Sequence, residues 1–361
     1  MATIVSVTPV ATTQPVVTQS VVDAPLGNTD LVPTGNGALQ RKTPKRSRRT
    51  KVVDRGFSRI FRWISTGAAV FILAVLAAVA VFLIARAAPA FTASEEALQA
   101  ALAHLPQART SIWQLIIPLI FGTLVVALLA LLISAPIAIG IALFISHYAP
   151  KRVASVISYV VDLLAAIPSV VFGLWGAMIL APRISGVWAW IARGLSHLPF
   201  WTVNSTATGR SVATASVVLA VMILPIITAV SREVFRQTPS LHEEAALALG
   251  ATRWEMIKTA VLPFGRSGVI SGAMLGLGRA LGETMAVLMI LSPGFLISLQ
   301  IFDAGQNQTI AAFIASMFPE SAGLTINVLL ATGLALFIIT MAVNMAARWV
   351  VSRRKEFSGA N

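Results

Sequence analysis

Long apolar stretches separated by short polar ones follow one another along most of this chain, and that pattern predicts membrane helices. Six stretches are apolar almost throughout: 63–88, 112–146, 155–181, 211–231, 268–292 and 324–350. Each reaches or exceeds the roughly 20 residues that an α-helix needs to cross the hydrocarbon core of a bilayer. We therefore expect an all-α membrane protein with six transmembrane helices, carried by a domain over residues 56–355.

Two of these stretches depart from a simple span. The first ends in small residues, 85–90, that resemble a signal cleavage site, but its length and the long tail before it favour an uncleaved helix. The second is too long for one straight helix. Pro118 near its start predicts an interfacial turn, and Pro136 and Gly140 within it predict a kink.

The two ends of the chain differ from this apolar region. Residues 1–40 show no helical period, and residues 41–62 hold ten Lys and Arg against the single acid Asp54. We expect 1–55 to be a disordered cytoplasmic tail with a basic segment, and 356–361 a short cytoplasmic C-terminal tail. A polybasic segment beside an apolar stretch is typical of a topology signal that also contacts anionic membrane lipids. A nucleic-acid-binding segment is less favoured, because no folded domain accompanies it.

The composition excludes several classes of protein. Apolar residues make up 57% of the chain and charged residues only 11%, whereas soluble domains carry about 25% charged residues. So few charges cannot cover a water-facing surface, which excludes a soluble enzyme, a disordered regulator and a fibrous protein. There is no cysteine, and the four histidines are not spaced as metal ligands. We therefore expect no disulfide, no thiolate chemistry and no metal site.

The net charge of +13, from 27 Lys and Arg against 14 Asp and Glu, is unevenly distributed along the chain. With the N-terminus inside, 21 of the 27 cations fall on the inner side and five in outer loops. By the positive-inside rule, both termini are expected on the cytoplasmic side of the inner membrane. The one remaining cation, Arg279, lies within the fifth apolar stretch.

The outer loop 182–210 is rich in aromatic residues, namely Trp188, Trp190, Phe200 and Trp201. Such residues are enriched at the membrane–water interface, which predicts a short surface helix there. A ligand-stacking site is the less favoured alternative.

The loop between the fourth and fifth stretches contains a helix–Gly–helix pattern. Pro239-Ser240 opens a first helix with acids in its first turn, and Gly250 ends it. A second helix follows and is expected to end near Pro263. An elbow of this shape can dock into a groove on another protein.

At these residues the chain resembles the integral membrane subunits of bacterial ABC importers, whose signature begins with Glu-Ala-Ala and a Gly and ends with Ile-x-Leu-Pro. Ala260 stands at the Ile position, a departure that costs apolar contact but leaves the elbow intact. In that family the elbow is the coupling helix seated on the ATPase subunit. The resemblance implies this ATPase-coupling role for Glu243, Glu244, Ala245, Ala246, Gly250, Leu262 and Pro263. The alternative is a surface helix without a partner.

The fifth stretch combines three glycines, Gly268, Gly272 and Gly276, with Arg279 and Glu283. On one continuous helix these five positions fall within about 80° of one another. The glycines predict a stripe on which another helix packs closely. Arg279 and Glu283 would lie one turn apart and are expected to neutralise each other.

Two interpretations of this charged pair stay open. An Arg inside the membrane must face a partner or a cavity, because its burial alone is costly. The pair could be an internal ion pair that holds the helix bundle together. Alternatively it is a substrate gate, in which the planar guanidinium binds a phosphate-like oxyanion and the carboxylate keeps that anion from being held too tightly.

The stretches 276–285 and 165–176 resemble the PstC-type permease subunits of the high-affinity phosphate (Pst) ABC transporters. The resemblance implies that Arg279 and Glu283 lie on the phosphate pathway. Asp162 in the third stretch could contribute, although a helix-capping or ion-pair role is favoured for it.

The resemblance covers about residues 63–355 and also implies partners. These are a second, PstA-like permease subunit, two copies of a PstB-like ATPase subunit that holds ATP and magnesium, and an extracytoplasmic PstS-like phosphate-binding protein. The chain has no Gly-Lys-Ser/Thr phosphate loop and no catalytic Ser/His/Asp pattern, so we expect no cofactor and no enzymatic activity in this subunit. The alternatives are an ABC permease for sulfate, molybdate or a small polar solute, a stand-alone secondary transporter, and a non-transporting scaffold.

Overall fold

The computed structural model describes residues 31–33, 39–41, 56–103, 111–195 and 204–352. Most of the predicted tail 1–55 and all of the tail 356–361 lie outside the described residues. Within the first tail, β1 (Leu31–Pro33) and β2 (Leu39–Arg41) pair antiparallel, with Val32 opposite Gln40.

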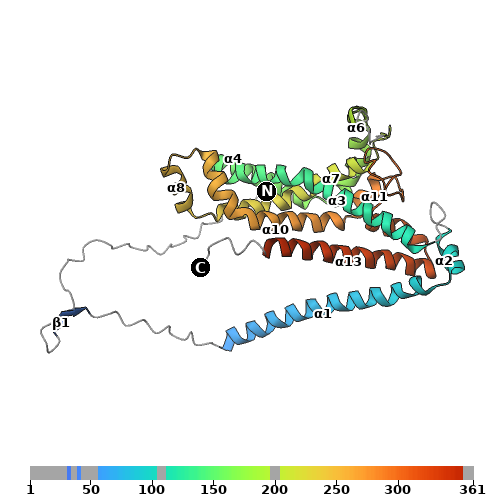
Figure 1. The fold of residues 1–361 in the computed structure, drawn as a ribbon, viewed down its shortest axis with the longest axis horizontal. Coiled ribbons are helices and arrows are strands. Elements are labelled where there is room, and N and C mark those ends of the chain that lie inside the picture. The colour runs from blue at the N-terminus through green and yellow to red at the C-terminus, as the bar shows by residue number, and fades with distance from the viewer. Residues whose placement is uncertain (1–30, 34–38, 42–55, 104–110, 196–203, 353–361) are drawn as a thin grey trace, which may run out of the picture. The chain divides into compact units, whose positions relative to one another are not determined.

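From residue 56 onward, every regular element among the described residues is helical (Figure 1). The α-helices are α1 (Gly56–Thr92), α2 (Glu95–Leu102), α3 (Ile112–Leu143), α4 (Lys151–Ala166), α5 (Ser169–Trp175), α6 (Ala181–Leu195), α7 (Val212–Arg236), α8 (Ser240–Ala248), α9 (Arg253–Met256), α10 (Leu262–Leu281), α11 (Met285–Ile290), α12 (Ile310–Met317) and α13 (Leu324–Ser352). Short π-helical turns (Phe144–Tyr148, Gly176–Leu180 and Ile257–Val261) and a 3₁₀ turn (Phe318–Glu320) extend or join them.

Six helical segments among the described residues are long and apolar enough to cross a membrane, as expected. They are Ile60–Thr92, Ile112–Tyr148, Ser169–Leu195, Val212–Arg236, Arg253–Leu281 and Leu324–Trp349. The all-α, six-span prediction is therefore confirmed, although the boundaries of the third and fifth segments differ from those expected.

The third apolar stretch, predicted as one helix over 155–181, is broken in the structure. α4 ends at Ala166, and Ile167 and Pro168 are extended, with ψ of 130° and 140°. The break follows from Pro168, because proline disfavours the α conformation in the residue before it. The helix restarts at Ser169 and continues to Leu195.

The second stretch begins more regularly than predicted. α3 begins at Ile112, where the side chain of Ser111 accepts a hydrogen bond from the backbone N–H of Trp113 at 3.4 Å. Pro118 lies inside α3 and is buried, so the interfacial turn predicted there is wrong. The side-chain cap at Ser111 sets the start of the helix instead.

α7 is the central helix of the bundle, and α3 and α10 lie beside it (Figure 1). In the most apolar 18-residue segment of α7, 72% of the residues are buried, and Leu219, Ile223 and Ile227 are almost fully buried. In α1, by contrast, no residue of the most apolar 18-residue segment is buried. An apolar segment left uncovered in this way is suited to contact with lipid or another subunit.

Glycines bring α10 close to α7. Each of four glycines on α10 lies where a side chain of α7 fills the space of a Cβ: Gly265 against Phe235, Gly268 against Val234, Gly272 against Val230 and Gly276 against Ile227. Three of these are the glycines of the stripe in the fifth apolar stretch. Small residues at such a contact let two helix backbones approach closely.

Replacing Gly268 with Ala tests this contact. The added methyl would overlap Cγ2 of Val234. Valine in a helix strongly prefers one χ1 rotamer, so Gly268→Ala is expected to destabilise the fold by about 1–3 kcal/mol. Gly140→Ala in α3 is the matched control, since a Cβ there meets nothing within 4 Å. It should be neutral or stabilise by about 0.5–1 kcal/mol through helix propensity. Thermal unfolding in detergent measures both, and equal transition temperatures would contradict the close contact.

Candidate functional site

The turn between α8 and α9 is closed by its own backbone. Gly250 follows α8 with a positive φ of 86°. Its N–H donates to the carbonyl of Leu247 at 3.0 Å, and the N–H of Ala251 donates to the carbonyl of Ala246 at 3.2 Å. This is the Schellman arrangement, which places its left-handed residue just after the helix end, where glycine carries no Cβ penalty.

α9 begins with a reciprocal cap on the other side of this turn. The N–H of Glu255 donates to Oγ1 of Thr252 at 3.3 Å, and the N–H of Thr252 donates to Oε2 of Glu255 at 2.8 Å. Such a capping box satisfies two backbone donors at once. Local hydrogen bonds on both sides of Gly250 therefore fix the elbow between the two helices.

The elbow presents an uncovered surface. No residue of α8 is buried, and the side chains of Leu241 and Leu249 are 73% and 90% exposed. α8 is held to the bundle by the partly buried Ala246 and by Glu243, whose Oε1 lies 3.3 Å from Nε2 of His147. Leu241 in α8 and Leu249 directly after it are apolar side chains that this chain leaves uncovered, which suits them to contact with another protein.

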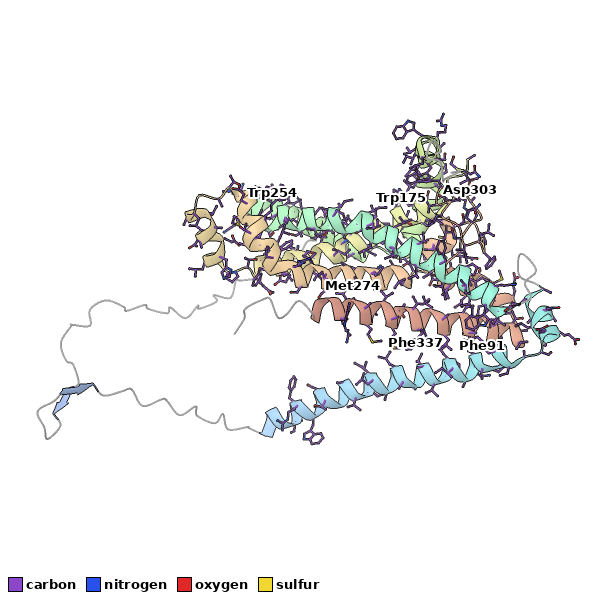
Figure 2. All side chains as sticks on the ribbon, in the orientation of Figure 1. Phe91, Trp175, Trp254, Met274, Asp303 and Phe337 are labelled. Atoms are coloured by element: carbon purple, nitrogen blue, oxygen red, sulfur yellow. The ribbon has the colours of Figure 1, made fainter. Side chains whose placement is uncertain are left out.

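The second helix of the elbow does not end near Pro263, and that prediction is wrong. α9, the π-helical turn Ile257–Val261 and α10 form one continuous helix, Arg253–Leu281. Leu262 and Pro263 lie within its course, directly after the π-helical turn. A proline is tolerated there because that turn already departs from the regular hydrogen-bond ladder. Figure 2 shows Trp254 at the α8 end of the bundle and Asp303 at the opposite end.

Arg279 and Glu283 do not form the helical pair that their spacing predicts. α10 ends at Leu281, so Glu283 lies beyond the helix. Its Oε1 accepts a hydrogen bond from the N–H of Ala286, in the first turn of α11, at 3.2 Å. A carboxylate is stabilised at that position by free backbone N–H groups. No hydrogen bond or ion pair joins the two side chains within the described part of the chain.

Arg279 lies on the exposed side of α10. Gly276 and Ala280 are buried in the bundle, whereas Leu275 on the adjoining face is 60% exposed. The guanidinium therefore lies on a surface that this chain leaves uncovered. Arginine presents five N–H donors in a planar fork, which suits an anion of phosphate geometry.

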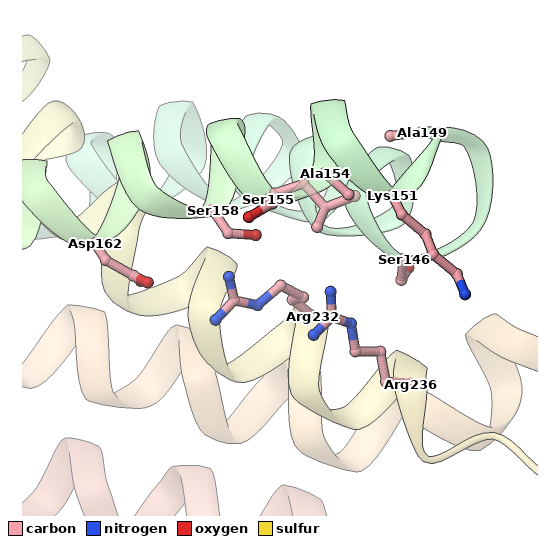
Figure 3. Close-up of a pocket in the computed structure, with 10 residues that line it drawn as sticks. Ser146, Ala149, Lys151, Ala154, Ser155, Ser158, Asp162, Arg232 and Arg236 are labelled. Atoms are coloured by element: carbon pink, nitrogen blue, oxygen red, sulfur yellow. The ribbon is translucent and has the colours of Figure 1, made fainter. Parts of the chain in front are cut away.

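A cavity of about 490 Å³ lies between α4 and α7 at the α8 end of the bundle (Figure 3). Lys151, Arg232 and Arg236 line it, together with Asp162 and several serines. In the sequence these three cations indicated membrane topology only. Arg232 and Arg236 are four residues apart and so share one face of a helix, a spacing that could have indicated the charged cavity.

One tryptophan of the aromatic outer segment packs against the rest of the chain. Nε1 of Trp188 donates to Oγ1 of Thr214 at 2.8 Å, and its ring packs on Phe302 with centroids 5.2 Å apart. Trp190 is 71% exposed, while Phe200 and Trp201 lie outside the described residues. Among the described residues, no group of three or more His, Cys, Asp or Glu could hold a metal ion.

The chain matches known proteins over most of its length. A family described as the binding-protein-dependent transport system inner membrane component matches residues 136–356. "Phosphate transport system permease protein PstC 2" of Mycobacterium tuberculosis is 42% identical over 297 residues, which cover 80% of this chain and 90% of the relative. "Phosphate transport system permease protein PstC" of Pasteurella multocida is 38% identical over 247 residues, covering 68% and 76%.

The fold is also found among solved structures. A chain of a bacterial ABC transporter involved in the import of the acidic polysaccharide alginate aligns with a TM-score of 0.50 and 16% identity. The alignment covers 82% of this chain and 99% of the other. At this identity the likeness concerns the fold alone.

Proposed function

This chain belongs to the binding-protein-dependent transport system inner membrane components, and on that premise we propose that it is the permease subunit of an ATP-driven phosphate importer. It is a multi-pass membrane protein and a transport subunit rather than an enzyme. The observation that carries the proposal is the 42% identity to a phosphate permease over 90% of that relative's length.

The proposed complex contains partners that would cover the two exposed surfaces of this chain. The exposed leucines of α8 support docking of the elbow on a separate ATPase subunit, which would be present in two copies and hold ATP and magnesium. The exposed face of α10 around Arg279 supports contact with a second, homologous permease subunit. An extracytoplasmic binding protein would deliver phosphate from the other side. The cation distribution supports a cytoplasmic location of both termini.

Arg279 is proposed to contact phosphate as it passes between the two permease subunits. Its guanidinium has no carboxylate partner within the described part of this chain, so an arriving oxyanion does not have to displace one. Charge-assisted hydrogen bonds from a planar fork favour a tetrahedral oxyanion over a neutral solute. Glu283, held on the N–H of Ala286, adds negative charge near the end of α10 and limits how tightly the anion is held.

The continuous helix Arg253–Leu281 offers a mechanical link between the elbow and this site. At 1.5 Å per residue, the segment from Arg253 to Arg279 is about 40 Å long. A rigid helix of this kind moves as one body, so a displacement of α9 by the closing ATPase pair also displaces Arg279. Such a displacement would open the pathway to one side of the membrane and then to the other.

Replacing Arg279 tests the pathway assignment. Arg279→Gln shortens the side chain and removes its charge but keeps it polar, and phosphate uptake by proteoliposomes with the assembled complex should fall by about 10- to 100-fold or more. Arg266→Gln, on the same helix and also exposed, is the matched control and should retain uptake. Uptake near the wild-type rate in Arg279→Gln would refute the assignment.

Replacing Gly250 tests the elbow. Proline cannot adopt the φ of 86° found there and lacks the N–H that bonds Leu247, so Gly250→Pro should detach the ATPase subunit or abolish its stimulation by the loaded binding protein. Gly250→Asn is the control, because asparagine tolerates a left-handed backbone. Co-purification of the ATPase subunit and ATP hydrolysis are the measurements. A fully stimulated, intact Gly250→Pro complex would exclude a coupling role for the elbow.

A further inference from the structure

The cavity between α4 and α7 is lined by polar and charged side chains that neither the pathway nor the elbow uses. Its lining residues are Ile145, Ser146, Ala149, Lys151, Ala154, Ser155, Ser158, Asp162, Arg232 and Arg236. Figure 3 shows Arg232 and Arg236 extending from α7 toward the serines of α4. Three cations against one carboxylate give this lining a net charge of +2.

Two polar atoms in this region lack a partner. Nε of Arg232 and Oγ of Ser158 are both buried without a hydrogen bond. Buried polar groups are nearly always paired, because leaving one unpaired forfeits its hydration. A guanidinium N–H and a hydroxyl in one positively charged cavity are both able to donate to the oxygens of a single anion.

A purely structural role explains only part of this arrangement. Cations in the last turns of a helix complement its dipole, which accounts for Arg236 at the end of α7. It does not account for the buried Nε of Arg232 or for the neighbouring serines. Lys151, at the start of α4, adds a charge at an end whose N–H groups have no side-chain cap, and such helix ends favour anions.

We propose that this cavity binds a phosphoryl oxyanion, either free phosphate or the phosphate of an anionic lipid headgroup. Arg232 and Arg236 supply charged donors from consecutive turns of α7, and Ser155 and Ser158 supply hydroxyl donors from α4. Asp162, at the far end of the lining, keeps the site from becoming uniformly cationic. The proposal does not depend on the transported substrate, because it uses none of the residues assigned to the pathway.

The site lies next to the contact that holds α8. Oγ of Ser146, a lining residue, is 2.6 Å from Nδ1 of His147. The other nitrogen of that ring, Nε2, is 3.3 Å from Oε1 of Glu243 on α8. Two side chains, Ser146 and His147, thereby connect an anion in the cavity to Glu243 on the elbow.

The test measures binding to the full-length chain in nanodiscs of zwitterionic phosphatidylcholine, with inorganic phosphate as the titrant. All proteins carry Arg279→Gln, so that the pathway site does not contribute. Arg232→Gln is expected to weaken binding by about tenfold or more, and Ser158→Ala, which preserves all charges, by a smaller but measurable factor. Arg266→Gln is the control, since it removes the same charge from α10 outside the cavity and should bind as the parent does. Circular dichroism and size-exclusion chromatography establish that each variant is folded.

A second arm distinguishes the source of the phosphoryl group. Nanodiscs that also contain phosphatidylglycerol are analysed by native mass spectrometry for lipid retained on the protein. The site is assigned to a lipid headgroup if free phosphate does not bind and if lipid retention is lost in Arg232→Gln and Ser158→Ala but kept in Arg266→Gln. If neither ligand distinguishes the cavity variants from Arg266→Gln, the proposal is overturned. Failure of the assembled complex with unchanged Arg279 to take up phosphate, while the cavity still binds its ligand, would instead count against the transport assignment alone.

Discussion

The close contact between α7 and the glycine face of α10 is the interaction on which the rest of the structure depends. α7 is buried against α3 on one side and α10 on another, and side chains such as Val234 and Ile227 occupy the space that larger residues on α10 would need. In lipid the hydrophobic effect does not drive helices together, so dispersion contacts at short range carry much of the association. This contact positions Arg279 at the end of α10 and Arg232 near the end of α7.

A second constraint connects the two ends of the bundle. The elbow is rigid because the Schellman arrangement at Gly250 and the capping box at Thr252 satisfy its backbone locally. Directly after it, the chain continues as a single helix to Leu281. A local turn that needs no tertiary support, attached to a long continuous helix, is a suitable lever between the proposed ATPase contact at one end and Arg279 at the other.

The sequence predicted those features that depend on short-range chemistry. Gly250 was expected to end α8, and it does so because only a left-handed residue closes that turn. The six apolar segments followed equally from composition and length. The expectations for Pro263 and Glu283 failed because each assumed a regular helix. A π-helical turn accommodates Pro263, and the carboxylate of Glu283 bonds the first turn of α11 rather than Arg279.

The sequence by itself determined the number of spans, the elbow and the presence of one arginine within an apolar stretch, because hydrophobic period, helix caps and charge are readable from neighbouring residues. Only the tertiary structure decided which surfaces stay uncovered and which charges meet. Lys151 and Arg232 lie more than eighty positions apart along the chain, yet they line one cavity because α4 and α7 are adjacent. Contacts of that kind depend on how helices pack, which local pattern does not encode.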